Sequence, residues 1–163
     1  NRVYLFDHFG STSIDNILSR VRFMAKGLGC SFVVLDHISI VVSSGDVGDE
    51  RKALDVLFTK LRTLTEELGV SLICVAHLKR LDGNQDHTDG VQVSLSHIRG
   101  SASIAQLSDA VVSLERNSNK NENKTVIRVL KNRFSGDTGI ASVANYDITT
   151  GRLVEENDQN FIF

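Results

Sequence analysis

Several residue types are scarce or missing in this chain, and each absence excludes a class of protein. The 163 residues contain no proline and only two cysteines, Cys30 and Cys74. One cysteine at a strand entrance and one inside an apolar run do not make the disulfide framework of a small secreted protein, so we expect reduced thiols. No stretch approaches the roughly 20 apolar residues of a membrane-spanning helix, and the first residues do not resemble a signal peptide. These absences predict an intracellular, cytoplasmic protein with no membrane partner.

A large excess of positive charge is also missing. The formal net charge is -2 at pH 7, with 23% charged and 41% hydrophobic residues. This balance argues against a generally basic nucleic-acid coat, so any contact with DNA must be local. The length suits one domain with a hydrophobic core, or part of one.

The phosphate-binding loop of many nucleotide-binding proteins is absent as well. Its pattern, G-x-x-x-x-G-K-S/T, occurs nowhere in the sequence. The backbone N–H groups of such a loop cradle the phosphates of the nucleotide. A nucleotide-binding fold would therefore need a loop that lies outside this chain.

What the sequence contains is an alternation of apolar runs and amphipathic segments, which indicates an α/β fold. Apolar runs predict strands over residues 3–7, 30–36 and 70–76. Apolar residues at helical spacing predict helices over residues 14–24 and 54–68, the first of them capped by the serine and threonine cluster at residues 11–13. The near-continuous apolar run at residues 30–36 predicts a parallel sheet that is covered on both faces.

The second half of the chain favours antiparallel pairing. A short helix is expected around residues 104–107 and a strand over residues 110–114. Residues 125–130 and 139–146 predict a hairpin, followed by a turn at residues 150–151. We therefore predict an α/β domain with a mostly parallel central sheet that finishes in an antiparallel hairpin.

Two strands of the predicted parallel sheet end on polar side chains, Asp36 and His77. Because ligands of open α/β sheets bind beyond the carboxyl ends of the strands, both side chains are expected at one site. Asp36 could hold a water-coordinated Mg²⁺ beside a nucleotide, and His77 could donate a hydrogen bond to a γ-phosphate. A strand-end turn or a helix cap is the alternative for Asp36, and a purely structural role is the alternative for His77.

Fixed positive charge occurs at two further places. Arg99 precedes a glycine, and Lys131 and Arg133 precede the turn at residues 136–139. Guanidinium groups recognise phosphate through paired N–H donors, and an arginine on a rigid hairpin could reach a neighbouring subunit and stabilise the charge of phosphoryl transfer. Surface ion pairing is the alternative for both places.

Two more features could contact a nucleotide or nucleic acid. Arg116 and Tyr146 could sandwich a base between a planar cation and a planar ring, with strand packing as the alternative. Residues 79–93 predict a long functional loop. Lys79 and Arg80 suit the tracking of a single strand, but the loop also carries three aspartates, so charge alone leaves its role open. The histidine spacings match no zinc template.

Four ordered motifs carry a resemblance to a known family. They are VVLDHISI at residues 33–40, VAHLK at 75–79, IRGS at 98–101 with QLSD at 106–109, and LKNRFSGDTG at 130–139. In order and spacing they resemble the RecA-like domain of hexameric DnaB-type replicative helicases, in particular phage primase-helicases and mitochondrial Twinkle. The resemblance covers residues 1–154, a partial RecA-like helicase domain from Walker B onward, and leaves residues 155–163 as a polar tail.

The resemblance implies a RecA-like P-loop NTPase core and a catalytic edge within it. Asp36 would be the Walker B carboxylate acting through Mg²⁺, and His77 the sensor on the next strand. Gln106 would be the coupling glutamine, and Arg99 would link the phosphate site to DNA.

The resemblance also implies roles for the remaining candidates. Arg133, with Lys131 beside it, would be an arginine finger inserted into the site of the adjacent subunit. Arg116 and Tyr146 would hold the nucleotide base. Lys79 and Arg80 would open a central-channel DNA loop, in which Gly83 and Gln85 stand where the family has lysines.

For the intact protein, the resemblance implies ATP or dTTP as substrate with Mg²⁺, and 5′-to-3′ movement on single-stranded DNA. Its partners would be the other subunits of a homo-hexamer or heptamer, a primase domain and a DNA polymerase, in a phage-infected or bacterial cell rather than a mitochondrial nucleoid. The Walker A loop and the upstream catalytic glutamate are missing. We therefore expect a C-terminal portion of a larger helicase that does not hydrolyse ATP on its own.

Two other functions remain open from the sequence. A RecA-like recombinase or ATPase of another process would share the sheet and Asp36, but would not need the Arg133 hairpin. A non-hydrolysing fragment would bind DNA or occupy a ring interface, and its DNA affinity would fall as the salt concentration rises.

Overall fold

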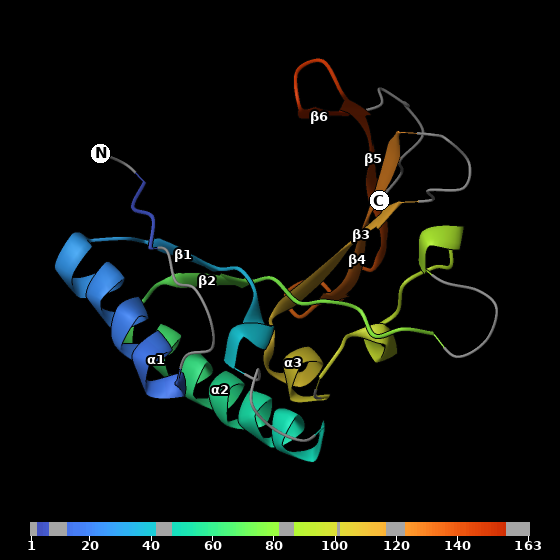
Figure 1. The fold of residues 1–163 in the computed structure, drawn as a ribbon. Coiled ribbons are helices and arrows are strands. Elements are labelled where there is room, and N and C mark those ends of the chain that lie inside the picture. The colour runs from blue at the N-terminus through green and yellow to red at the C-terminus, as the bar shows by residue number, and fades with distance from the viewer. Residues whose placement is uncertain are drawn as a thin grey trace. The chain divides into compact units, whose positions relative to one another are not determined.

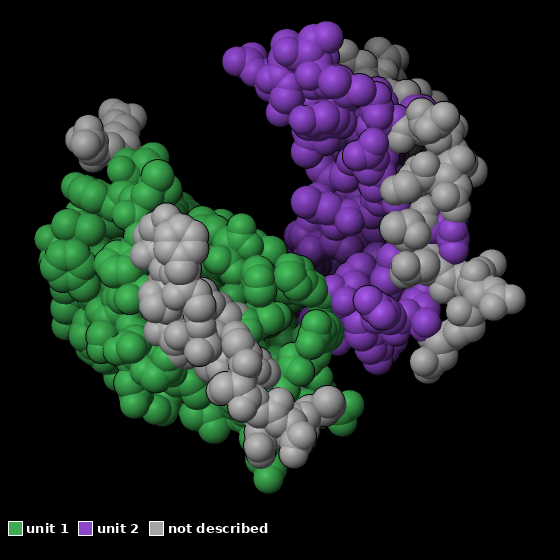
Figure 2. All heavy atoms as spheres, in the orientation of Figure 1, with its two compact units in different colours: residues 1–77, 99–107 green, residues 78–98, 108–163 purple. Residues whose placement is uncertain are grey.

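The computed structural model describes residues 3–6, 13–41, 47–81, 87–100, 102–116 and 123–155. The chain forms two compact units, coloured separately in Figure 2: unit 1 is residues 1–77 with 99–107, and unit 2 is residues 78–98 with 108–163. Among the described residues, unit 1 contains a two-stranded parallel sheet and unit 2 a four-stranded antiparallel sheet. The predicted strands therefore belong to two separate sheets, and parallel pairing is confined to unit 1.

Unit 1 is a β-α-β arrangement preceded by a helix (Figure 1). Its elements are α1 (Ile14–Arg22) with a π-helical turn (Phe23–Gly27), β1 (Phe32–Leu35), α2 (Val47–Leu68), β2 (Ser71–Cys74) and α3 (Ala102–Leu107). The Ser13 hydroxyl accepts a hydrogen bond from the N–H of Asn16, so the predicted N-cap of the first helix is confirmed. α1, β1 and β2 appear where hydrophobic periodicity placed them, whereas α2 begins at Val47 and not at the predicted residue 54.

The core of unit 1 lies between the helices. Apolar side chains at intervals of three and four residues are buried along both long helices: Ile17, Val21, Leu54, Leu57, Leu61 and Leu64. Such a stripe is what an amphipathic helix offers to a packing partner, and α1 and α2 do contact each other. Each fully buried leucine contributes roughly 1.5–3 kcal/mol through loss of apolar surface from water.

The expectation that the parallel strands are covered on both faces is wrong for this chain. Val33 is buried, but Phe32 and Val34 on the opposite face of β1 are 70% and 61% exposed, and Ile73 of β2 is 54% exposed. Both long helices lie to one side of the strand pair in Figure 1. The apolar run therefore has only one covered face among the described residues.

The strand predicted over residues 3–7 is also wrong where it can be judged. Residues 3–6 have no strand conformation, and Val3 and Leu5 are 73% and 92% exposed. An apolar run becomes a strand only when another strand pairs with its backbone, and none does here among the described residues. Residue 7 lies outside the described ranges, as do residues 82–86 of the predicted loop, including Gly83 and Gln85, and residues 156–163 of the predicted tail.

Unit 2 is built on an antiparallel meander in the order β3-β4-β5-β6. The strands are β3 (Ala110–Arg116), β4 (Lys124–Asn132), β5 (Gly139–Asp147) and β6 (Arg152–Glu155). The predicted hairpin is confirmed, and β6 is an additional strand that was not predicted. Asp147 shapes the turn before β6: hydrogen bonds from Thr149 and Thr150 lower the pKa of its carboxyl to about 2.

The two faces of β3 differ in an unusual way. Val112 and Leu114 point to an exposed face, whereas Ser113 and Glu115 point to the covered one. Glu115 accepts from Arg128 at 2.9 and 3.3 Å and from the Ser113 hydroxyl at 2.8 Å, and only 13% of the Glu115 side chain is exposed. This sheet therefore encloses a hydrogen-bonded ion pair rather than an apolar cluster at this point.

No helix in the described ranges has both the length and the apolar run needed to cross a bilayer.

Both cysteines are free, and burial raises the pKa of the Cys74 thiol to about 11. Because only the thiolate reacts, Cys74 should alkylate slowly at pH 8 and faster as the pH approaches 11. In a Cys30→Ser variant, Cys74 is the remaining thiol. At pH 8 we expect it to react with iodoacetamide at least 10-fold more slowly in the folded protein than in the urea-unfolded protein, as measured by mass spectrometry. Equal rates in the folded and unfolded states would show that Cys74 is not shielded.

Candidate functional site

The carboxyl ends of β1 and β2 meet at one edge of unit 1. Leu35 lies opposite Cys74 in the last pair of the ladder. Beyond it, Val75 donates to the carbonyl of Leu35 at 2.9 Å, and Ile38 donates back to the carbonyl of Val75 at 3.0 Å. These bonds hold the segments that carry Asp36 and His77 side by side. Both side chains are exposed, as groups that receive a ligand must be.

The edge contains a second imidazole, that of His37, which was not predicted as a site residue. The ring of His37 packs on that of His77, with ring centroids 4.2 Å apart. The Nδ1 atom of His37 is buried and has no hydrogen-bond partner among the described residues. The sequence did contain a signal for this contact. His37 lies just beyond β1 and His77 just beyond β2, and the carboxyl ends of adjacent parallel strands lie at the same edge of a sheet.

Arg99 joins the same edge through its backbone. Its N–H donates to the carbonyl of His77 at 2.8 Å. Its guanidinium forms a 3.4 Å ion pair with Glu50, whose side chain is only 14% exposed near the start of α2. Glu50 was not predicted, because nothing in its local sequence distinguishes it from other helix-surface carboxylates. Gln106 lies on α3 with an exposed side chain.

Gly100 offers a test of how tightly this edge is packed. Its φ is +113°, and a Cβ there would collide with Leu54 and lie 3.3 Å from Ile104. Gly100→Ala should therefore lower the free energy of unfolding by about 2–4 kcal/mol, from backbone strain plus overpacking. Gly29→Ala is the matched control in the same unit, since its φ of +68° is also positive but its surroundings are open. Thermal unfolding that showed equal losses for both variants would remove the packing argument.

In unit 2, Arg133 is placed at the end of β4 on an ordered hairpin. Its Nη1 atom lies 3.2 Å from Oδ1 of Asp109, and 53% of its side chain is exposed. Arg99 and Arg133 thus both form the surface ion pairs that were the alternative to phosphate binding. An exposed pair such as Arg133–Asp109 is weak, about 0–1 kcal/mol, and does not prevent the guanidinium from contacting an anion as well. Lys131 lies on β4 opposite Val111.

Arg116 and Tyr146 share one face of the antiparallel sheet. Arg116 is opposite Thr125, which is opposite Ala144, and Tyr146 is two residues beyond Ala144 on β5. Asn123 contacts both: its side chain accepts from the Arg116 guanidinium at 3.1 Å and its carbonyl accepts from the Tyr146 N–H at 2.7 Å. Arg116 and Ala144, which are separated by one strand, stand about 10 Å apart at their backbones, and Tyr146 lies further along β5.

Lys79 and Arg80 are exposed at the start of the long loop. The backbone of Lys79 is held on both sides: its N–H donates to the carbonyl of His97 at 2.9 Å, and its carbonyl lies 3.1 Å from Nε2 of His87. The rings of His87 and His97 are 5.1 Å apart. The base of the loop is therefore fixed by two histidines, for which the sequence indicated no role.

The structure thus gathers the predicted residues in two groups. Unit 1 brings together Asp36, His77 and Arg99, and unit 2 carries the cationic and aromatic candidates. Asp36 suits Mg²⁺, because this ion is commonly held by one or two carboxylates with water and substrate phosphates. The described residues contain no cluster of three or more acidic, histidine or cysteine side chains that would form a closed metal cage. The residues present therefore fit a shared Mg²⁺–nucleotide site better than a structural metal.

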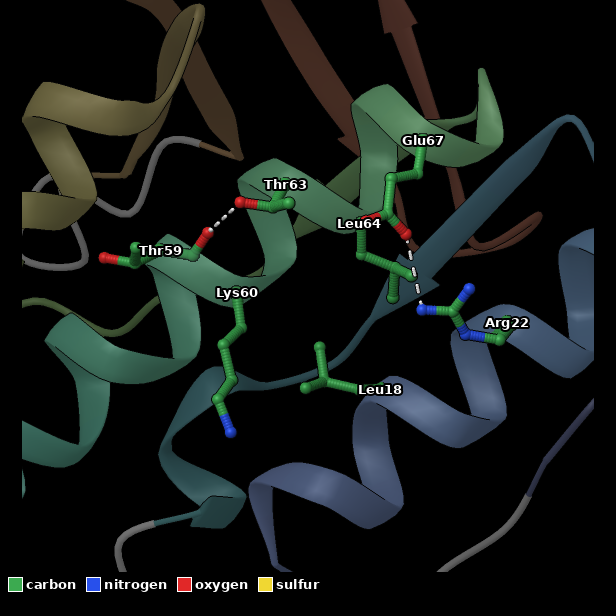
Figure 3. A pocket seen from close by; sticks show the side chains of 7 residues that line it. All are labelled: Leu18, Arg22, Thr59, Lys60, Thr63, Leu64 and Glu67. Atoms are coloured by element: carbon green, nitrogen blue, oxygen red, sulfur yellow. Dashed lines mark hydrogen bonds and ion pairs between the residues drawn. The ribbon is translucent and has the colours of Figure 1, made fainter.

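A groove of about 250 Å³ lies elsewhere in unit 1, between α1 and α2 (Figure 3). Its rim carries the ion pair between Arg22 and Glu67, and Lys60 pairs with Asp15 at 3.1 Å. None of its lining residues lies at the strand tips. The groove is separate from the candidate site.

A model of the DnaB-like helicase C terminal domain matches residues 1–151. The chain belongs to the DnaB-like helicase family. The family named from the four motifs is thereby confirmed, and membership favours a helicase over a recombinase.

Known relatives and structures of the DnaB-like family agree with this. The chain is 44% identical over 151 residues to a DNA helicase/primase of Enterobacteria phage T3, covering 92% of this chain and 27% of that protein. It is 28% identical over 148 residues to the replicative DNA helicase DnaC of Bacillus subtilis (strain 168), covering 87% and 32%. The chain therefore spans about a quarter to a third of these relatives.

Solved structures give the fold. The chain superposes on a solved ATPase domain with a TM-score of 0.71 at 19% identity, over 93% of this chain and 54% of that one. A DnaB-like replicative helicase described with its primase interactions gives 0.69 at 20% identity, over 91% and 36%. The predicted α/β, RecA-like fold class is confirmed.

Proposed function

We propose that this chain is part of the motor of a replicative DNA helicase, which couples hydrolysis of ATP or dTTP to 5′-to-3′ movement on single-stranded DNA and to duplex unwinding. The observation that carries the proposal is the edge of unit 1, where the segments bearing Asp36, His77 and Arg99 are hydrogen-bonded to one another in a chain of this family. The T3 relative is named a DNA helicase/primase, and the Bacillus subtilis relative a replicative DNA helicase.

At this edge, Asp36 would hold Mg²⁺, which neutralises phosphate charge when bound. His77 would donate a hydrogen bond to the terminal phosphate and so distinguish nucleoside triphosphate from diphosphate. Because the N–H of Arg99 bonds to the His77 carbonyl, a shift of the His77 segment would move Arg99 directly. Gln106 would pass this movement towards DNA.

The groups of unit 2 would complete a site formed between subunits. Arg133 would act as the finger on the nucleotide held by a neighbour, with Lys131 beside it. Arg116 and Tyr146 would hold the base, and Lys79 and Arg80 would contact the DNA backbone. The working form would be a hexamer or heptamer, served by a primase domain and a DNA polymerase, and it would need a P-loop that this sequence does not contain.

The proposal is tested with the full-length protein that carries this chain. We expect hydrolysis of ATP or dTTP that is stimulated by single-stranded DNA, and unwinding of a forked duplex with a 5′ tail. Asp36→Asn should abolish both activities, because an amide does not replace the carboxylate as a ligand of a hard cation. DNA binding without hydrolysis in the wild-type protein would instead favour a non-hydrolysing DNA-binding module.

A further inference from the structure

Asp109 contacts Arg133 twice, once through the backbone and once through the side chain. The carbonyl of Asp109 accepts from the N–H of Arg133 at 2.8 Å, and its Oδ1 accepts from Nη1 of Arg133 at 3.2 Å. Asp109 stands just before β3 and Arg133 just after β4, where Ala110 pairs with Asn132. Asp109 therefore holds both the backbone and the guanidinium group of Arg133.

The turn that follows Arg133 is held by a second set of contacts. Oδ1 of Asn132 accepts from the N–H groups of Phe134 and Ser135, and the Ser135 hydroxyl accepts from Asn132 and Asp137. The N–H of Gly136 closes the turn on the carbonyl of Asn132 at 2.9 Å. With this backbone fixed, the remaining freedom of Arg133 is in its side chain, which is what Asp109 restricts.

The geometry leaves the guanidinium able to bind an anion. A guanidinium has five N–H donors in a planar fork, and Asp109 accepts from Nη1. More than half of the Arg133 side chain is exposed, against 32% for Asp109. A surface ion pair of this kind adds only about 0–1 kcal/mol to stability. Its main physical effect is to select one orientation of the fork.

We infer that Asp109 is a positioning residue for Arg133, which presents the guanidinium in the orientation needed to contact a phosphate bound by a neighbouring subunit. The inference rests on the proposed function, because it needs Arg133 to act in hydrolysis. It predicts that loss of Asp109 slows the chemical step without weakening nucleotide binding. It also predicts that the loss of rate on removing Asp109 requires the planar guanidinium group at position 133.

The test uses the full-length protein with Asp109→Ala, Asp109→Asn, Arg133→Lys and the double variant Asp109→Ala/Arg133→Lys. We expect Asp109→Ala to lower kcat about 10- to 100-fold, because a misplaced catalytic group costs that much, with KM and Tm near their wild-type values. Asp109→Asn keeps an acceptor oxygen and should retain most of the rate. Lysine has no planar fork to orient, so Asp109→Ala should change the rate of Arg133→Lys by less than about threefold.

The comparison between backgrounds keeps the test valid if Asp109→Ala also affects folding, because that effect occurs in both. Wild-type kcat in Asp109→Ala would overturn the inference. So would an equal fold loss in the wild-type and Arg133→Lys backgrounds, since Asp109 would then act independently of the arginine. If Arg133→Lys itself hydrolyses at the wild-type rate, the finger role in the proposed function fails, which is a distinct result.

Discussion

Arg133→Ala in the full-length protein is expected to lower kcat for nucleotide hydrolysis about 10³-fold or more, while the Kd for nucleotide stays within about twofold. The reason is that a finger arginine contacts charge that develops only in the transition state, so its loss affects the rate and not the ground-state complex. Steady-state hydrolysis and equilibrium nucleotide binding measure the two quantities separately. Arg152→Ala is the matched control, since it removes an exposed arginine from β6 of the same unit.

The same variant tests whether the arginine acts between subunits. Mixed with Asp36→Asn subunits, Arg133→Ala subunits should regain hydrolysis, because an interface can combine the intact Asp36 of one subunit with the intact Arg133 of the next. A mixture no more active than its components would place Arg133 in its own subunit's site. Wild-type kcat for Arg133→Ala would remove the finger assignment altogether.

Glu115→Ala should destabilise unit 2 by about 3–5 kcal/mol, the cost of leaving a buried charge without its partner. The change removes two contacts to Arg128, at 2.9 and 3.3 Å, and the acceptor of the Ser113 hydroxyl. Only 16% of the Arg128 side chain is exposed, so water cannot fully replace the lost carboxylate. Thermal or urea unfolding followed by circular dichroism gives the loss.

Two companion variants separate this cause from a general weakness of β3. Leu114→Ala lies one residue away on the exposed face and should cost about 0.5 kcal/mol or less. Glu115→Leu combined with Arg128→Met replaces both charges by apolar groups and should recover most of the lost stability. A loss in Leu114→Ala as large as that in Glu115→Ala would contradict the ion-pair explanation.

Local sequence was sufficient for the elements and for the first members of the site. Helical spacing located α1 and α2, and turn residues located the hairpin around Gly136, because periodicity and turn chemistry depend on neighbours a few residues away. Asp36 and His77 could be paired from sequence because parallel strands bring their carboxyl ends to one edge.

Two predictions were wrong because they depended on contacts between distant parts of the chain. The predicted strand over residues 3–7 and the cover on both faces of the parallel sheet each required a packing partner that periodicity does not supply. β6 was missed for another reason: its residues, RLVE at 152–155, lack the alternation of polar and apolar residues that predicts a strand. A local pattern states which face an element would bury, but not whether anything covers it.

The sequence by itself determined the α/β class, the family and the chain positions of Asp36, His77 and Arg133, since these depend on local patterns and ordered motifs. Only the tertiary structure decided which groups accompany them: His37 on the ring of His77, Glu50 on Arg99, Asp109 on Arg133, and Asn123 between Arg116 and Tyr146. His37 reaches His77 across two strand tips, and Asp109 ends the QLSD motif, but Glu50 and Asn123 are ordinary polar residues with no local signature. Strand register, turn geometry and helix packing bring each of them to its contact, and these are properties of the folded chain.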